Sequence, residues 1–174
     1  MGTLYLVRHC RAAGQAPEAP LTAEGLAQAE RLADVLAPLA PDRIVSSPFR
    51  RAVQSVEPLA ARLNLPIELD DRLRERLLTT APGDWLEQFR RSFDDLDAVL
   101  EGGESTRAAM ARGAAAIEAA LAHPARATVL ACHGNLSTLI LRHFDGRAGF
   151  AEWRAMTNPD VFRIVAGRPG RIWS

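Results

Sequence analysis

Short apolar runs alternate along the chain with stretches of helical periodicity. Runs rich in β-branched and other apolar residues predict buried strands at 3–7, 44–45, 67–69, 128–131 and 161–166. Apolar positions at helical spacing predict helices over 26–40, 52–63, 105–122 and 135–143. Strands that alternate with helices predict an α/β fold, a three-layer sandwich with a mixed, mostly parallel central sheet.

Helix starts can be placed from the capping residues. Thr22 has the side chain of an N-cap, and Leu26 opens the apolar face of the helix that follows. Ser47 and Pro48 suit the N-cap and the first position of the second helix. Pro58 lies inside that helix and is expected to kink or split it.

The segment 76–104 has no strand pattern and differs from the rest of the chain. Its helical stretch carries Trp85, Phe89 and Phe93 among polar residues, which predicts a small inserted helical cap. We expect these aromatic side chains to pack within the cap rather than to form a stacking surface for a ligand. The chain as a whole, residues 1–174, is expected to form a single domain with one core.

Composition and charge exclude several classes of partner. Of the 174 residues 48% are hydrophobic, and the 21 basic side chains balance 21 acidic ones, so nothing indicates a nucleic-acid or membrane partner. No apolar run approaches the ~18 residues that span a bilayer, and the N-terminal residues lack the pattern of a signal peptide. Two cysteines are too few for a disulfide framework. These features predict a cytoplasmic protein, and they leave its oligomeric state open.

Candidate chemistry lies where two predicted strands end. His9 follows the first strand and His133 follows the fourth. Because parallel strands bring their carboxyl ends to one edge of a sheet, we expect the two histidines to meet there. Arg8 adjoins His9, and Arg51 lies in the first turns of the second helix, where anions are favoured. Guanidinium groups bind phosphate bidentately, so this group of residues predicts a phosphate pocket.

Five motifs in order make the chain similar to a known family. They are Leu6-Val7-Arg8-His9, residues 21–29, residues 46–52, Gly103-Glu104-Ser105 and Cys132-His133-Gly134. Together they resemble the histidine phosphatase superfamily, also called phosphoglycerate-mutase-like, from residue 3 to about residue 140. The resemblance implies a histidine acid-type phosphatase that hydrolyses a small phosphorylated substrate, without a cofactor or metal.

The resemblance also implies a role for each matching residue. His9 would be the nucleophile that becomes phosphohistidine, while Arg8, Arg51 and His133 would bind the phosphoryl oxygens and stabilise the transition state. Phosphoryl transfer depends on this kind of positioning and charge neutralisation. Neighbouring positive charge should also keep His9 in the neutral form that can attack phosphorus.

The leaving oxygen needs a proton, which the resemblance assigns to Glu75 as general acid and base. The alternatives are Asp70 and Asp71, just before it, or a carboxylate in the cap. Three other residues lie beside the predicted pocket and could touch the substrate at its rim: Arg11, Gln15 and Asn135.

Some positions depart from the family pattern. Cys10 stands where a glycine usually follows the nucleophile, and the glycine and tryptophan usually found soon after the acid appear only at Gly83 and Trp85. The loop after His9 lacks the acidic-tryptophan-asparagine pattern of the glycolytic mutases, which favours hydrolysis. The alternatives are a phosphoglycerate mutase-type isomerase and a catalytically weak relative that only binds phosphate.

The two cysteines each adjoin a predicted catalytic histidine, as His9-Cys10 and Cys132-His133. Zinc binds such residues, but adjacent residues on a strand point to opposite faces and do not converge on one ion easily. A redox-sensitive pair is the second alternative. Ordinary buried thiols are the default interpretation.

Overall fold

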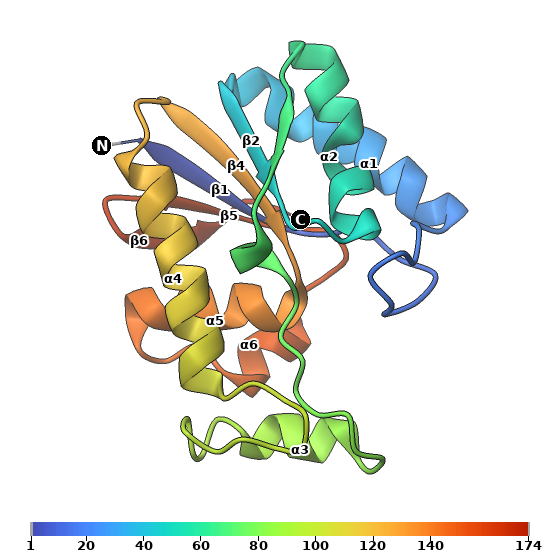
Figure 1. The fold of residues 1–174 in the computed structure, drawn as a ribbon. Coiled ribbons are helices and arrows are strands. Elements are labelled where there is room, and N and C mark those ends of the chain that lie inside the picture. Colours follow the sequence, from blue (N-terminus) through green and yellow to red (C-terminus); the bar gives the residue numbers. More distant parts are fainter. Residues whose placement is uncertain (1, 174) are drawn as a thin grey trace.

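A computed structural model, which describes residues 2–173, contains one six-stranded sheet (Figure 1). Met1 and Ser174, the ends of the predicted domain, lie outside the described residues. The strands are β1 (Thr3–Arg8), β2 (Arg43–Ser46), β3 (Ile67–Leu69), β4 (Ala127–Cys132), β5 (Asp160–Val165) and β6 (Arg168–Arg171). They lie in the order β3-β2-β4-β1-β5-β6. The first four are parallel, and β5 and β6 add an antiparallel edge, which confirms a mixed, mostly parallel sheet.

Helices cover both faces of this sheet. Tyr5 and Val7 of β1 pack into one apolar cluster with α1 (Ala23–Leu36) and α2 (Arg50–Leu63). The alternate residues of β1 point to the other face, where they pack against α4 (Thr106–Ala122) and α5 (Gly134–Asp145). Since successive side chains of a strand point to opposite faces, one buried strand serves both cores. The predicted three-layer sandwich is confirmed.

The start of α1 follows the prediction, and so does its buried face at Ala29, Ala33 and Leu36 but not at Leu26. Thr22 is the N-cap, and its hydroxyl accepts a hydrogen bond from the Gly25 N–H at 3.0 Å. Leu26 remains 50% exposed, so placing it on the buried face was wrong. The buried positions run from Gly25 through Leu32 to Leu36, and residue 26 lies about 100° around the helix from residue 25. After Leu36 the chain makes a 3-10 turn, η1 (Ala37–Leu39).

The predicted start of α2 was wrong. The helix begins at Arg50, and its N-cap, Phe49, makes no side-chain capping bond. Ser47 is not the cap, because its hydroxyl lies 2.8 Å from Nε2 of His133 instead. Pro58 does not split the helix, which continues to Leu63.

Between β3 and β4 the chain forms a short 3-10 turn, η2 (Asp71–Leu73), then α3 (Trp85–Arg91) and then α4. In Figure 1, α3 lies apart from the sheet, at the lower edge of the molecule. Ser105 caps α4 through the Ala108 N–H. The sequence did not predict α6 (Phe150–Ala155) or β6. Within residues 2–173, no helix is both long enough and apolar enough to cross a membrane.

The aromatic residues of α3 pack against α6. Phe89 is fully buried, with its ring centroid 5.2 Å from that of Phe93, 5.8 Å from that of Phe150 and 4.9 Å from that of Trp153. Packing of Phe89 and Phe93 therefore agrees with the expectation. Trp85 differs, because it remains 44% exposed and lines a cavity.

Candidate active site

The two histidines meet because their strands are neighbours. β1 and β4 pair in parallel, with Arg8 in register with Cys132, and the His9 N–H donates to the Cys132 carbonyl at 3.0 Å. The residue that follows each strand is a histidine, so both histidines lie at the same edge of the sheet. The ring centroids of His9 and His133 lie 5.1 Å apart, at an angle of 64°.

Backbone and side-chain contacts set the tautomer and the protonation state of His9. Its Nδ1 lies 2.7 Å from the carbonyl oxygen of Cys10, which can only accept, so Nδ1 carries the hydrogen. The lone pair is then on Nε2, to which the Nε–H of Arg51 donates at 3.2 Å. Burial, with a smaller contribution from the charges of Arg51 and Arg8, lowers the pKa of His9 to about 4, although the hydrogen bond to Cys10 opposes the shift. His9 is a neutral imidazole at neutral pH.

Arg8 brings a buried cation to the same place. Its Nη1 donates to the Met156 carbonyl at 3.3 Å, and its buried Nε–H has no hydrogen-bond partner among residues 2–173. Burial lowers the pKa of this guanidinium, while Glu75 and Asp160 oppose that shift. A buried donor without a protein partner is costly unless an acceptor binds there. The unpaired N–H is suited to an anion.

Arg51 holds the loop after β1. The side chain is fully buried, and its Nη1 donates to the carbonyls of Gln15 at 3.0 Å and Ala16 at 2.9 Å. Its Nε donates to His9, so one planar group connects the nucleophile candidate with the loop. Burial lowers the pKa of Arg51, and Glu75 opposes the shift.

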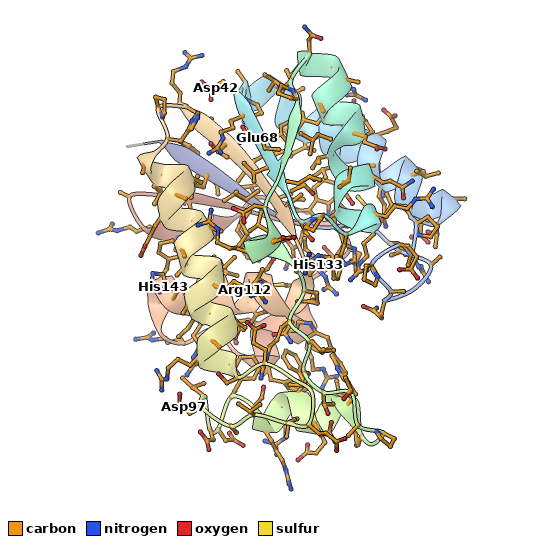
Figure 2. All side chains as sticks on the ribbon, viewed as in Figure 1. Asp42, Glu68, Asp97, Arg112, His133 and His143 are labelled. Carbon is orange, nitrogen blue, oxygen red and sulfur yellow. The ribbon has the colours of Figure 1, made fainter. Side chains whose placement is uncertain are left out.

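His133, labelled in Figure 2, directly follows β4 and precedes α5, and its side chain is completely buried. Its Nε2 lies 2.8 Å from the Ser47 hydroxyl, and its Nδ1 has no partner among residues 2–173. Burial lowers the pKa of His133 well below its usual value, helped by His9 and Arg51. His133 is therefore neutral. Its neighbours Gly134 and Asn135 line the cavity, whereas its own ring lies behind that surface.

Glu75 lies at the N-terminus of α5. Its carboxylate accepts backbone N–H groups from Arg76 at 2.9 Å and from Asn135 and Leu136 at 3.0 Å each. Burial raises the pKa of this carboxyl group, although the three N–H groups and Arg51 favour the ionised form. A buried carboxyl group with a raised pKa can hold a proton and release it.

The two alternative carboxylates are used elsewhere. Asp70 accepts a bidentate pair of hydrogen bonds from Arg72, and Asp71 pairs with Arg74 at 2.7 Å. Neither aspartate lines the cavity, whereas Glu75 does. Of these three carboxyl groups, Glu75 is therefore the one that the structure brings to the site.

These groups open onto a cavity of about 670 Å³. Its lining includes Arg8, His9, Arg51 and Glu75 together with the three predicted rim residues, Arg11, Gln15 and Asn135. It also includes Arg76 and Trp85, and residues that the sequence did not single out for binding, among them Leu77, Trp153 and Asn158.

Asn158 is the missed residue with the clearest structural effect. Its Nδ2 donates to the His9 carbonyl at 2.8 Å, from the loop just before β5. Nothing around position 158 in the sequence signals this contact, because the partner lies 149 residues away.

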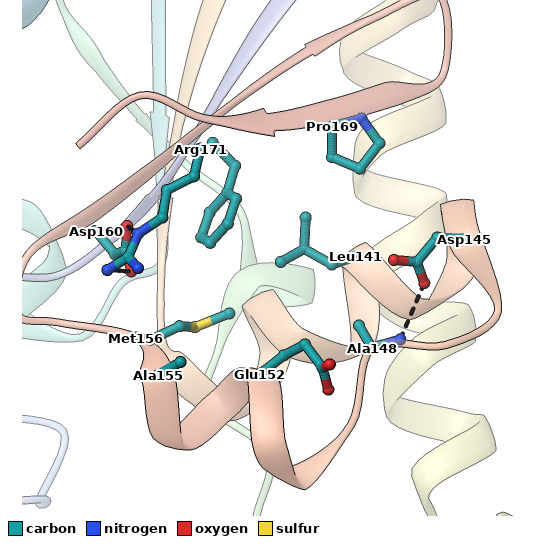
Figure 3. Close-up of a pocket in the computed structure, with 10 residues that line it drawn as sticks. Leu141, Asp145, Ala148, Glu152, Ala155, Met156, Asp160, Pro169 and Arg171 are labelled. Atoms are coloured by element: carbon teal, nitrogen blue, oxygen red, sulfur yellow. Dashed lines mark hydrogen bonds and ion pairs between the residues drawn. The ribbon is translucent and has the colours of Figure 1, made fainter. Parts of the chain in front are cut away.

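A second cavity, of about 280 Å³, lies between α5, α6 and the antiparallel edge (Figure 3). Its charged residues already have partners. Asp160 pairs with Arg171 at 2.8 Å, and Glu152 accepts the Gly149 N–H at 2.7 Å. Asp145 accepts the Ala148 N–H at 3.0 Å. Because these groups are satisfied within the protein, the larger cavity is the better candidate for a functional site.

Cys10 and Cys132 are buried free thiols on opposite faces of the sheet. They pack in different apolar clusters, which disfavours a disulfide between them in this fold. Burial raises the pKa of Cys10 to about 11 and that of Cys132 to about 12. Within residues 2–173, no three His, Cys, Asp or Glu side chains gather in a way that could hold a metal ion.

An α/β sheet with paired histidines and arginines at its carboxyl edge defines an anion-binding site of the kind that phosphate-transforming proteins carry. Comparison with known proteins identifies the family. The model of the histidine phosphatase superfamily (branch 1) matches residues 4–168, and the chain belongs to that superfamily. A search of curated proteins found no significant match.

Solved structures agree with this assignment. The chain is 27% identical to a mycobacterial glucosyl-3-phosphoglycerate phosphatase in complex with inorganic phosphate, over 95% of this chain and 90% of that one, with a TM-score of 0.77. It is 25% identical to a protein titled mycobacterial hydrolase 1, over 99% and 97% of the two chains, with a TM-score of 0.76. A phosphoserine phosphatase from Entamoeba histolytica, 18% identical over 98% and 95% with a TM-score of 0.79, shares the fold.

Proposed function

We propose that this protein is a metal-independent phosphomonoester hydrolase that acts through a phosphohistidine on His9. One observation carries the proposal. The Cys10 carbonyl holds the hydrogen of His9 on Nδ1, so the lone pair of Nε2 faces the cavity beside Arg51. The glucosyl-3-phosphoglycerate phosphatase among the similar structures supports hydrolysis of a phosphomonoester.

In the first step, the lone pair of Nε2 attacks phosphorus and the bond to the leaving alcohol oxygen breaks. Glu75 gives its proton to that oxygen, so the alcohol leaves neutral and the carboxylate remains. Arg8, with its unpaired Nε–H, and Arg51 neutralise the charge on the phosphoryl oxygens. The Nε–H of Arg51 then donates its hydrogen bond to a phosphoryl oxygen instead of to Nε2 of His9.

In the second step, water attacks the phosphohistidine and gives a proton to the Glu75 carboxylate. The phosphorus–nitrogen bond breaks, its electron pair returns to Nε2, and inorganic phosphate leaves. The three backbone N–H groups on Glu75 stabilise the carboxylate between the steps. Because the pKa of His9 is about 4, the nucleophile stays unprotonated in mildly acidic solution, which supports an acid-type phosphatase.

His133 acts next to the nucleophile in this proposal. Its neutral ring lies 5.1 Å from that of His9, and its Nδ1 has no partner within residues 2–173. The Ser47 hydroxyl orients the ring through Nε2. In the proposed mechanism, this nitrogen binds a phosphoryl oxygen.

The test is a panel of phosphomonoesters, including a generic aryl phosphate, with wild type and His9→Ala. We expect turnover by the wild type, retained in excess chelator, and an acid-labile phosphohistidine that is trapped at early times and absent in His9→Ala. His123→Ala, which changes an exposed histidine, is the matched control. Equal turnover by His9→Ala would overturn the proposal, and interconversion of phosphoglycerates would indicate a mutase instead.

A further inference from the structure

The cavity has an aromatic wall that the phosphoryl chemistry does not use. Trp85 of α3 and Trp153 of α6 both line it, with ring centroids 5.6 Å apart and ring planes at 60°. We propose that the alcohol part of the substrate carries a flat ring without a positive charge, which packs against Trp85 and Trp153. This inference rests on the proposed phosphatase function.

The two tryptophans are held in place before any ligand arrives. Phe89 is fully buried behind them, stacked on Trp85 at 5.3 Å and edge-on to Trp153 at 4.9 Å. Phe150 stacks on the other side of the cluster, 5.7 Å from Trp153. A rigid aromatic surface loses little entropy when a ring packs on it, so this wall is preorganised for binding.

The exposed apolar side chains of the cavity indicate where the ring of the substrate would lie. Trp85 is 44% exposed and Leu77 is 53% exposed, and both line the cavity. Apolar side chains gathered at a cavity mouth indicate a surface that a ligand covers. The cavity volume of about 670 Å³ leaves room for a large group beyond the phosphoryl group.

Charge selects among the rings that could bind there. Arg8, Arg11, Arg51 and Arg76 line the cavity, and Glu75 is its one acidic lining residue within residues 2–173. An aromatic pair can also attract an ammonium group, but four guanidinium groups around one carboxylate repel it. The same excess of positive charge attracts a phosphate dianion. The lining therefore favours a neutral or anionic ring over an alcohol that bears an amine.

The experiment compares two substrates that share the reacting alcohol. Adenosine 5′-monophosphate and ribose 5-phosphate both release a primary ribose oxygen and differ by the purine ring. We expect the wild type to hydrolyse the nucleotide with a kcat/KM about tenfold or more above that of the sugar phosphate, through a lower KM, because stacking on an aromatic side chain gives a gain of this size. Phosphocholine should be a poor substrate.

Variants of Trp85 test the wall itself. Trp85→Ala should remove most of the preference for the nucleotide, because kcat/KM for adenosine 5′-monophosphate should fall much more than kcat/KM for ribose 5-phosphate. Trp85→Phe, which keeps a ring, should restore the preference. Leu86→Ala is the matched control, because Leu86 is 46% exposed on the same helix but does not line the cavity.

The outcomes separate this inference from the proposed function. If both esters are hydrolysed with equal kcat/KM, or if Trp85→Ala keeps the preference, the ring-binding wall is wrong and the phosphatase stands. Preference for phosphocholine would likewise overturn it. If neither these esters nor a generic aryl phosphate is hydrolysed, the proposed function fails, and the ring-binding wall fails with it.

Discussion

Gly134 makes room for the guanidinium of Arg8. A β-carbon at position 134 would lie 2.8 Å from both Cζ and Nε of Arg8, closer than two such atoms can approach. Gly134 is the first residue of α5 and directly follows His133. The glycine of the Cys132-His133-Gly134 motif is thus explained by an arginine at the end of a neighbouring strand.

Gly134→Ala should therefore act on Arg8. We expect the added methyl group to displace the guanidinium and to lower kcat/KM for an aryl phosphate by about 100-fold, the usual cost of losing one group that stabilises developing charge. Gly170→Ala is the control, because a β-carbon there meets nothing within 4 Å. Steady-state kinetics check both variants. Unchanged activity in Gly134→Ala would show that Arg8 does not need its observed position.

Arg51→Lys should lower activity far more than a substitution that keeps the charge usually does. Lysine lacks the planar fork that reaches Nε2 of His9 and the carbonyls of Gln15 and Ala16 together. We expect kcat/KM to fall by about 100-fold or more. Arg50→Lys, at the adjacent and exposed position, should have little effect. Near-normal kinetics of Arg51→Lys would remove Arg51 from the phosphate site.

The titration of His9 should lie far from that of a free imidazole. With a pKa of about 4 instead of 6.5, its ring proton resonances in the nuclear magnetic resonance spectrum should shift with a midpoint near pH 4. Comparison with His9→Asn identifies the signal. A midpoint near 6.5 would show that His9 is solvated rather than buried beside Arg51 and Arg8.

The same shift makes stability depend on pH. Between pH 6.5 and about 4, the unfolded chain binds a proton at His9 that the folded chain does not bind. The free energy of unfolding should therefore fall as the pH is lowered through this range, by up to about 3 kcal/mol. Urea unfolding of wild type and His9→Asn at several pH values isolates the contribution. Parallel pH dependence in the two proteins would contradict it.

Cys10→Ala should leave catalysis nearly unchanged. The site uses the backbone of Cys10, since its carbonyl accepts from His9 and its N–H donates to Ser55 Oγ at 2.8 Å. The thiol lies in the core on the α1–α2 face. We expect kcat/KM within about threefold of wild type and a loss of about 1–2 kcal/mol of stability from the smaller side chain. A large loss of activity would point to a chemical role for the thiol.

Local patterns predicted much of the fold. The buried strands β1 and β4 and the caps of α1 and α4 could be located from short apolar runs and from Thr22 and Ser105. The start of α2 could not, because Ser47 bonds to His133, a partner 86 residues away. A hydroxyl that suits a helix cap suits a buried imidazole equally well, and tertiary contacts decide between them.

For the site, the sequence by itself determined which side chains meet at the carboxyl edge. His9 and His133 follow strands that pair in parallel, and strand period and topology bring such positions together. Only the tertiary structure decided that His9 presents Nε2, that Asn158 holds its carbonyl and that Trp85 faces the cavity. These features depend on contacts between residues far apart in the chain, which the local pattern of hydrophobic and polar positions does not encode.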